Sequence, residues 1–276
     1  MTSIRHSTVL ITGGASGIGR QMGLAFLEKQ CAKLVVWDLD EEGLEAAVAE
    51  WSSAGYDVYP YLVDVTNTTH VDELAADVLH AVGKVDILIN NAGIVIGKDF
   101  VSHTNQDIDN TIDVNIRGVM QVTRAFLPPM IASGSGHVVN IASAAGLIPN
   151  PKMSVYAGSK WAVLGWSESL RLELEEVARN LNVTTVTPSY IDTGMFEGVK
   201  APLLTPLLKP EEIVKEIVSA VEENKILVRA PKIVNYLPFL RGVLPTRLFD
   251  FTAKQLGVYS SMEDFTGRSE NPRSDK

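Results

Sequence analysis

The stretch TGGASGIG, residues 12–19, decides the fold of this chain. It follows the apolar run Val9–Ile11 and opens a segment with apolar residues at helical spacing. A bound phosphate needs backbone N–H donors and close approach to the backbone, which glycine permits. A helix N-terminus supplies such donors and a favourable dipole. The stretch therefore predicts a dinucleotide-binding turn, with Gly13 turning the chain, Gly17 beside the pyrophosphate and Gly19 packing the helix on the sheet.

The second apolar run ends in an acidic residue, Asp38, which follows Gly19 at an offset of about 20 residues. At this offset a carboxylate meets the ribose hydroxyls of a bound dinucleotide. Such a carboxylate would repel a 2′-phosphate, and the next residue, Leu39, is not an arginine that would pair with one. This pattern favours NAD over NADP. The alternative is a solvated acidic turn that caps a helix, for which Asp40 is the better placed residue.

Short apolar runs rich in β-branched residues recur along the chain and alternate with segments of helical pattern. Runs without polar alternation are typical of strands covered on both faces. The pattern predicts an α/β fold, a doubly wound parallel sheet of about seven strands with helices on both faces, known as the Rossmann fold. The expected strands are Val9–Ile11, Leu34–Trp37, Val58–Val63, Ile87–Ile89, Val138–Ile141, Val183–Val186 and Ile226–Val228. The expected helices are Gly17–Gln30, Glu41–Ala54, Thr69–Val82, Asn105–Ile131, Ser154–Leu181 and Pro210–Asn224.

The chain of 276 residues contains no composition break that would divide it into two domains. We expect a single NAD-binding catalytic domain over residues 1–230, including a substrate lid at about 194–210. Residues 231–268 are expected to form an apolar C-terminal appendage on this domain, followed by a polar, disordered tail over residues 269–276.

Composition excludes several classes of protein. Hydrophobic residues make up 46% of the chain and charged residues 21%, as in ordinary globular proteins. The net charge of −9 argues against binding of nucleic acid. The single cysteine, Cys31, forms no internal disulfide, and the five histidines lack the spacing of a metal site.

These features, and the lack of a secretion signal or membrane-spanning run in the sequence, lead us to expect a cytoplasmic protein without a bound metal. The late apolar stretch, residues 233–251, is interrupted by prolines and charges. It predicts a docked or interfacial segment, and peripheral contact with a membrane stays open.

A tyrosine and a lysine four residues apart, Tyr156 and Lys160, share one face of an expected helix, and Ser143 follows the strand before it. Tyrosine is a poor base at neutral pH, with a pKa near ~10. A nearby ammonium favours the phenolate, and a serine hydroxyl can hold a substrate oxygen while the tyrosine moves the proton. Taken alone, such a pair is also common on exposed structural helices.

The order of five motifs carries more information than any one of them. The glycine-rich turn is followed by the sequence NNAG at residues 90–93, by Asn115, by Ser143 and by the Tyr156–Lys160 pair. This order resembles the single-domain branch of the short-chain dehydrogenase/reductase family over about residues 7–230. The sequence of residues 257–265 resembles, less specifically, family members that act on steroids, retinoids and related lipophilic alcohols.

The resemblance implies a role for each catalytic residue. Tyr156 would be the acid/base, and Lys160 would lower the pKa of Tyr156 and bind the nicotinamide ribose. Ser143 would orient the substrate oxygen, and Asn115 would anchor a water in a proton relay through Lys160.

The same resemblance, with the glycine-rich turn, defines a cofactor site. Asp64 and Val65 would bind adenine, and the loop 188–193 would hold the nicotinamide carboxamide. In that loop Ser189 stands where the family usually has glycine. The predicted cofactor contacts are Gly13, Ser16, Gly17, Ile18, Gly19, Asp38, Asp64, Val65, Asn91, Ala92, Gly93, Tyr156, Lys160, Pro188, Ile191 and Thr193.

We therefore expect an NAD-dependent oxidoreductase that interconverts a secondary alcohol and a ketone. The apolar lid and C-terminal stretch predict a bulky hydrophobic substrate, such as a steroid-like, retinoid-like or aryl alcohol. The alternatives are an NADPH-dependent carbonyl or 3-oxoacyl reductase, a catalytically silent dinucleotide-binding regulator, and more weakly a lyase or epimerase. The resemblance also implies a homodimer or homotetramer formed through helices at about 105–131 and 154–181.

Overall fold

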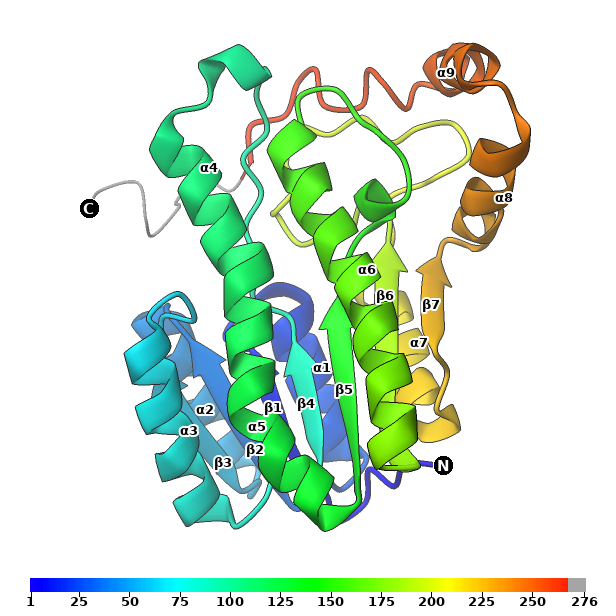
Figure 1. Cartoon of the computed structure of the whole chain (residues 1–276). Helices are drawn as coiled ribbons and strands as arrows, with labels where there is room; N and C mark the ends of the chain where they lie inside the picture. The colour runs from blue at the N-terminus through cyan, green and yellow to red at the C-terminus, as the bar shows by residue number, and fades with distance from the viewer. Residues whose placement is uncertain (268–276) are drawn as a thin grey trace.

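A computed structural model describes residues 1–267 of the chain, so the predicted disordered tail lies outside the described residues. Seven strands form one parallel sheet in the order β3-β2-β1-β4-β5-β6-β7 (Figure 1). This arrangement confirms the predicted doubly wound Rossmann fold in a single domain. The strands are β1 Thr8–Thr12, β2 Lys33–Asp38, β3 Val58–Leu62, β4 Ile87–Asn90, β5 Ser135–Ile141, β6 Asn180–Pro188 and β7 Leu227–Ala230. The helices are α1 Gly17–Glu28, α2 Glu41–Ser53, α3 Thr68–Val82, α4 Asn105–Ile112, α5 Val119–Ser133, α6 Ser154–Val177, α7 Pro210–Glu223, α8 Leu237–Val243 and α9 Thr246–Gln255.

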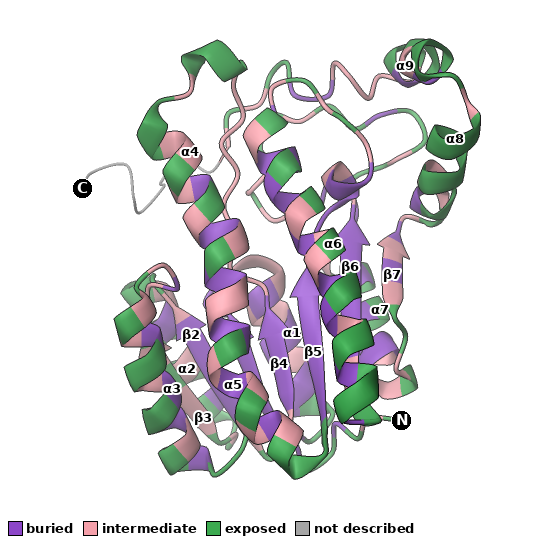
Figure 2. Ribbon diagram, in the orientation of Figure 1, coloured by how far each residue is buried: buried purple, intermediate pink, exposed green. Residues whose placement is uncertain are grey.

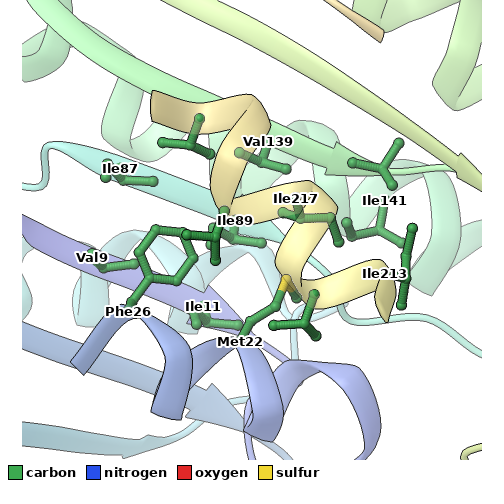
Figure 3. Packing of buried hydrophobic residues seen from close by; sticks show 14 of the residues in the cluster. Val9, Ile11, Met22, Phe26, Ile87, Ile89, Val139, Ile141, Ile213 and Ile217 are labelled. Atoms are coloured by element: carbon green, nitrogen blue, oxygen red, sulfur yellow. The ribbon is translucent and has the colours of Figure 1, made fainter. Parts of the chain in front are cut away.

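Two apolar clusters cover the two faces of the sheet, because successive strand residues point to opposite faces. In β1, Val9 and Ile11 face α1 and α7, where they contact the cluster that includes Phe26 and Ile217 (Figure 3). Leu10, between them, faces the cluster built on α3, α5 and α6. The burial of central strands on both faces explains their unbroken apolar runs (Figure 2).

The order of strands places a crevice beside the glycine-rich turn. Neighbouring strands β1 and β4 lead to crossovers that run in opposite directions across the sheet. Ligands of open α/β sheets bind at such a switch point, outside the carboxyl ends of the strands. The turn after β1 and the sequence NNAG after β4 both lie at this edge.

Three expected elements differ from the structure. The helix expected over Asn105–Ile131 is interrupted by a π-helical segment, Asp113–Gly118, which separates α4 from α5. The helix expected to reach Leu181 ends at Val177, because Leu181 pairs with Gly136 as part of β6. The third strand lies at the edge of the sheet and is only partly buried, although its sequence predicted burial on both faces.

The appendage forms α8, α9 and a returning segment that lies against the lid. The backbone N–H of Lys200 donates to the carbonyl of Ser261 at 3.0 Å. Arg241 of α8 donates to the Leu147 carbonyl at 2.9 Å and stacks 4.3 Å from the centre of the Trp161 ring. Much of α8 and α9 is nevertheless exposed (Figure 2). No helix among residues 1–267 has the length and apolar character needed to span a membrane.

A buried histidine in β5 makes the stability of the fold sensitive to acid. The ring of His137 lies 2.7 Å from the hydroxyl of Thr184 and 3.1 Å from that of Thr2. Burial, and secondly the charge of the N-terminus, lower the pKa of His137 from 6.5 to about 4. Between about pH 4 and pH 6.5 the folded state then binds fewer protons at His137 than the unfolded state does. The contribution of neutral His137 to the free energy of unfolding is therefore complete above about pH 6.5 and is lost toward pH 4.

We therefore expect the free energy of unfolding to fall by about 3 kcal/mol through His137 as the pH drops from about 7 to about 4. Denaturant titrations of the wild type and His137→Gln across this range measure the effect. The variant, which cannot titrate, should have a shallower pH dependence. Equal pH dependences in the two proteins would show that His137 contributes nothing.

Candidate active site

The glycine-rich turn has the backbone geometry that a phosphate-binding turn requires. Gly13 and Gly17 have positive φ angles of 65° and 54°, which residues with a side chain rarely adopt. A Cβ at Gly19 would overlap the carbonyl oxygen of Gly13, so the first turn of α1 fits against the loop only without a side chain. The first turn of α1 contains no acidic residue, which keeps its positive end available to an anion.

The end of β4 holds this turn in place. The Asn91 side chain donates to the carbonyls of Thr12 and Gly13 at 3.0 and 2.8 Å. The Thr12 hydroxyl accepts from the backbone N–H groups of Asn91 and Ala92 at 3.0 and 3.1 Å. Thr12 therefore positions the glycine-rich turn, a role that the sequence did not reveal because its partners are 79 and 80 residues away.

The acidic turn after β2 serves two purposes at once. Asp40 caps α2 by accepting from the Gly43 N–H at 3.1 Å, and Asp38 accepts from the Ala15 N–H at 2.8 Å. Asp38 thus lies against the glycine-rich turn. Arg20, the basic residue nearest the turn in sequence, forms an ion pair with Glu50.

One large cavity, of about 510 Å³, joins these elements at the carboxyl edge of the sheet. Most of the predicted site residues line it, but Gly19, Asp64 and Asn115 do not. Asp64 accepts hydrogen bonds from the backbone and hydroxyl of Thr66 instead. The lining residues are Gly13, Ser16, Gly17, Ile18, Trp37, Asp38, Leu39, Asp40, Val63, Val65, Asn91, Ala92, Gly93, Ile94, Val114, Ile141, Ala142, Ser143, Tyr156, Lys160, Pro188, Ser189, Ile191, Thr193, Met195 and Phe196.

Several of these lining residues were not predicted from the sequence. Trp37 had a detectable signal, because it directly precedes Asp38 at the end of β2. Met195 and Phe196 come from the lid, and their place in the cavity depends on how that irregular segment folds. Ser189 replaces the expected glycine without strain, since it is not among the residues with positive φ.

The cavity brings Ser143 and Tyr156 together at one end. Burial raises the pKa of Tyr156 to about 12, and a hydrogen bond with Ser143 opposes this rise. Phe196 of the lid meets the Tyr156 ring edge-on, with ring centres 6.3 Å apart. A buried phenol that keeps its proton at neutral pH can donate that proton to a substrate oxygen.

Lys160 lies on the same face of α6, with its ammonium 5.7 Å from the centre of the Tyr156 ring. Its Nζ donates to the Ile141 carbonyl at 2.9 Å. Burial lowers the pKa of Lys160 to about 8, so the ammonium form still predominates at neutral pH. The expected lowering of the Tyr156 pKa is not seen in this structure: burial raises that pKa, and Ser143, not Lys160, is the group that opposes the rise. The lysine supplies a buried positive charge beside the phenol.

Asn115 lies in the π-helical segment, next to the helix that carries Tyr156 and Lys160. Its amide nitrogen donates to the Ile94 carbonyl at 2.9 Å, and its amide oxygen accepts from the Ile94 N–H at the same distance. The amide also donates to the hydroxyl of Ser159, one residue before Lys160 in α6. The regular α-helix is interrupted here by the wider π-helical turn. In this turn the Asn115 side chain bonds to the backbone of Ile94, which follows β4.

These features fit a nicotinamide dinucleotide. The cavity offers a glycine-rich turn at a helix N-terminus, a carboxylate at the end of β2 and a lysine at the other end. No group of three or more potential metal-ligating side chains occurs within residues 1–267. Fold and site together define a Rossmann-fold oxidoreductase.

Comparison with known proteins identifies the family. The family profile described as short chain dehydrogenase matches residues 7–203. The chain belongs to this family of short-chain dehydrogenases/reductases.

Its relatives include retinoid and steroid dehydrogenases. Epidermal retinol dehydrogenase 2 of Mus musculus is 39% identical over 270 residues, which cover 96% of this chain and 87% of that protein. Estradiol 17-beta-dehydrogenase 11 of Macaca fascicularis is 33% identical over 257 residues, covering 93% and 85%.

Solved structures of the family contain either dinucleotide. A short chain dehydrogenase/reductase from Burkholderia phymatum in complex with NAD has a TM-score of 0.81 at 26% identity, covering 91% of this chain and 97% of that one. A metagenomic short-chain oxidoreductase in complex with NADP has a TM-score of 0.70 at 26% identity, covering 83% and 96%.

Proposed function

We propose that this chain is an NAD-dependent dehydrogenase that interconverts a secondary alcohol and a ketone on a bulky hydrophobic substrate. The observation that carries the proposal is that Ser143, Tyr156 and Lys160 line the same dinucleotide-sized cavity, with the Lys160 ammonium 5.7 Å from the centre of the buried Tyr156 ring. NAD, when bound, would accept or donate the hydride. Ser143 would hold the substrate oxygen, Tyr156 would exchange its proton with that oxygen, and Lys160 would stabilise the phenolate that results.

The substrate class follows from a second cavity next to the first. This cavity, of about 120 Å³, shares Ser143 with the cofactor cavity, and its walls are mostly apolar. Lid residues such as Leu204 and appendage residues such as Leu237 and Val258 form them. The chemical character of a pocket's lining matches that of its ligand, so these apolar walls favour a hydrophobic alcohol. The retinol and estradiol named for the relatives belong to the same chemical class.

A screen of NAD reduction tests this proposal. Steroid, retinoid, aryl and aliphatic alcohols are mixed with the protein and NAD, and absorbance of the reduced cofactor is followed. We expect turnover of hydrophobic alcohols and little turnover of short polar ones. Absence of reduction across the panel with either cofactor would favour the alternative, a catalytically silent dinucleotide-binding regulator.

The preference for NAD rests on charge. Lys160 is the one basic side chain among the described residues that line the cofactor cavity, and Asp38 lies at the opposite end. Contact between the Asp38 carboxylate and the 2′-phosphate of NADP would bring two negative charges together, which costs several kcal/mol. We therefore expect kcat/KM for NAD to exceed that for NADP by about 10²-fold. Asp38→Asn should reduce this ratio about tenfold or more.

Steady-state kinetics with both cofactors measures the ratio. Glu41→Gln is a matched control, because it removes a neighbouring negative charge that does not line the cavity. Its ratio should equal that of the wild type. A wild-type enzyme that uses NADP as well as NAD would contradict the assignment and support the NADPH-dependent reductase alternative.

We also propose a homodimer or homotetramer formed through the long helices α5 and α6. Leu172 and Val177 of α6 are more than half exposed in the single chain, as expected of a face that a second copy would cover. Light scattering after size-exclusion chromatography tests the assembly. A cytoplasmic location stays a prediction.

A further inference from the structure

Exposed apolar side chains gather on the appendage, at the corner of the molecule that α8 and α9 form (Figure 1). On α8 and the residue before it, these side chains are spaced three and four residues apart, so they share one face. Such a face normally turns to the core, but here it turns to solvent. The exposed set, which we call the α8–α9 patch, consists of Tyr236, Phe239, Leu240, Val243, Leu248 and Phe251. Exposed apolar groups of this kind mark a surface that binds a protein or a lipid.

Positive charge surrounds this patch, although the net charge of the chain is −9. Residues 231–262 include one acidic residue, Asp250, whose carboxylate accepts a hydrogen bond from the Tyr259 hydroxyl at 2.8 Å. The basic residues of the same stretch, all of them exposed, are Lys232, Arg241, Arg247 and Lys254. Charges that lie farther away than about 10 Å are largely screened by physiological salt. The α8–α9 patch therefore combines apolar side chains with a local excess of positive charge.

The apolar cavity beside Ser143 opens on the same patch. Among the residues that line this cavity, Leu240 of α8 and Leu204 of the lid are the exposed ones. The lid also lies against the end of α9, where the backbone N–H of Leu203 donates to the Leu256 carbonyl at 3.1 Å. A ligand that enters the cavity between Leu204 and Leu240 therefore crosses the patch.

We infer that the α8–α9 patch docks on a membrane surface that contains anionic lipids, with its apolar side chains among the headgroups and its basic side chains beside the lipid phosphates. An anionic leaflet attracts this combination of side chains. A second copy of the chain is a poorer partner, because two such patches facing each other would bring like charges together. The docking goes beyond the proposed function and does not depend on it. If that function holds, a hydrophobic alcohol dissolved in the lipid would reach the cavity without crossing water.

Binding to vesicles tests the inference. The full chain is mixed with vesicles of phosphatidylcholine, with or without phosphatidylserine, and the bound fraction is measured by flotation in the absence of cofactor and substrate. Each basic residue near an anionic leaflet strengthens binding about fivefold. We therefore expect binding to the vesicles with phosphatidylserine to be tighter by about tenfold or more, and high salt to remove most of this difference.

Substitutions on the patch locate the docking surface. Phe239→Ser combined with Leu248→Ser removes two exposed apolar side chains and should weaken binding to both kinds of vesicle by about tenfold or more. Arg247→Gln combined with Lys254→Gln should weaken binding to the anionic vesicles by about tenfold and leave binding to phosphatidylcholine unchanged. All four side chains are exposed, so these variants should fold, which thermal unfolding checks.

Matched substitutions at the opposite edge of the sheet serve as controls. Ile226 precedes β7 and is 47% exposed, against 49% for Leu248. Arg5 and Arg179 are exposed and precede β1 and β6. Because the strands are parallel, these residues lie at the amino edge, whereas α8 and α9 follow the carboxyl end of β7. Ile226→Ser, and the combination of Arg5→Gln with Arg179→Gln, should bind both kinds of vesicle as the wild type does.

The outcomes distinguish the docking from its alternatives and from the proposed function. The inference is wrong if the wild-type protein does not bind the anionic vesicles, or if the patch variants bind them as well as the wild type does. Loss of self-association in the patch variants, measured by light scattering without any vesicle binding, would assign the patch to an interface between copies of the chain. Turnover of alcohols without vesicle binding would overturn the docking alone, and vesicle binding without turnover would overturn the proposed function alone.

Discussion

Replacing Tyr156 with phenylalanine is expected to lower kcat by about 10²–10⁴-fold while leaving the affinity for NAD within a few-fold of the wild type. The substitution keeps the ring, which packs edge-on against Phe196, and removes only the hydroxyl that contacts Ser143. The glycine-rich turn and Asp38, which would bind the other end of the cofactor, stay unchanged. Stopped-flow or steady-state kinetics gives kcat, and quenching of tryptophan fluorescence gives the dissociation constant for NAD.

A matched control removes a hydroxyl elsewhere. Tyr236 is 60% exposed and lines neither the cofactor cavity nor the apolar cavity, so Tyr236→Phe should behave as the wild type. A Tyr156→Phe enzyme that retains a third or more of wild-type turnover would show that another group moves the proton.

Adding one methyl group at Gly19 is expected to have the second largest effect. A Cβ there would overlap the Gly13 carbonyl oxygen and would lie 2.6 Å from the Asn91 amide nitrogen. Both atoms belong to the hydrogen bond that holds the turn to β4, so α1 and the turn must move apart. Such overpacking costs up to about 3 kcal/mol. If the free protein relieves this strain and binding of NAD restores it, the dissociation constant for NAD rises by about 10²-fold.

The control is a glycine in a helix with open space around it. No atom lies within 4 Å of a Cβ added at Gly165 of α6. Gly165→Ala should therefore leave NAD binding unchanged and stabilise the fold by up to about 1 kcal/mol. Calorimetric titration with NAD and thermal unfolding measure both quantities. Wild-type affinity for NAD in Gly19→Ala would contradict the packing derived for the turn.

The sequence predicts most of the fold because the central strands are buried on both faces. Runs such as Val9–Ile11 and Ile87–Ile89 must be apolar throughout, and this leaves a clear local signal. The edge strand β3 carries a similar run, in which Pro60 is the one local sign of an edge position, because proline cannot donate to a neighbouring strand. The partial exposure of β3 was not predicted. The break at Asp113–Gly118 was not predicted either, because it depends on the distant backbone of Ile94, to which Asn115 bonds.

The site was predictable where it rests on local motifs and not where it rests on tertiary contacts. The glycine-rich turn, Asp38, Ser143 and the Tyr156–Lys160 pair are each read from a few neighbouring residues, and the structure brings them to one cavity. Beside this cavity, Asn150, Tyr190 and Ser261 form a cluster in which the Asn150 amide donates to both hydroxyls, although the residues lie up to 111 positions apart. No pattern in the sequence relates such residues, so the cluster emerged only from the folded chain.

Transfer of deuterium tests the central claim most directly. The best alcohol found in the screen is labelled with deuterium on the carbon that bears the reacting hydroxyl and incubated with the wild-type protein and NAD. We predict that the recovered reduced cofactor carries one deuterium per molecule of ketone formed, and that Tyr156→Phe forms little of either product. Reduced cofactor without deuterium, or label transfer at the wild-type rate by Tyr156→Phe, would contradict hydride transfer with Tyr156 as the acid/base.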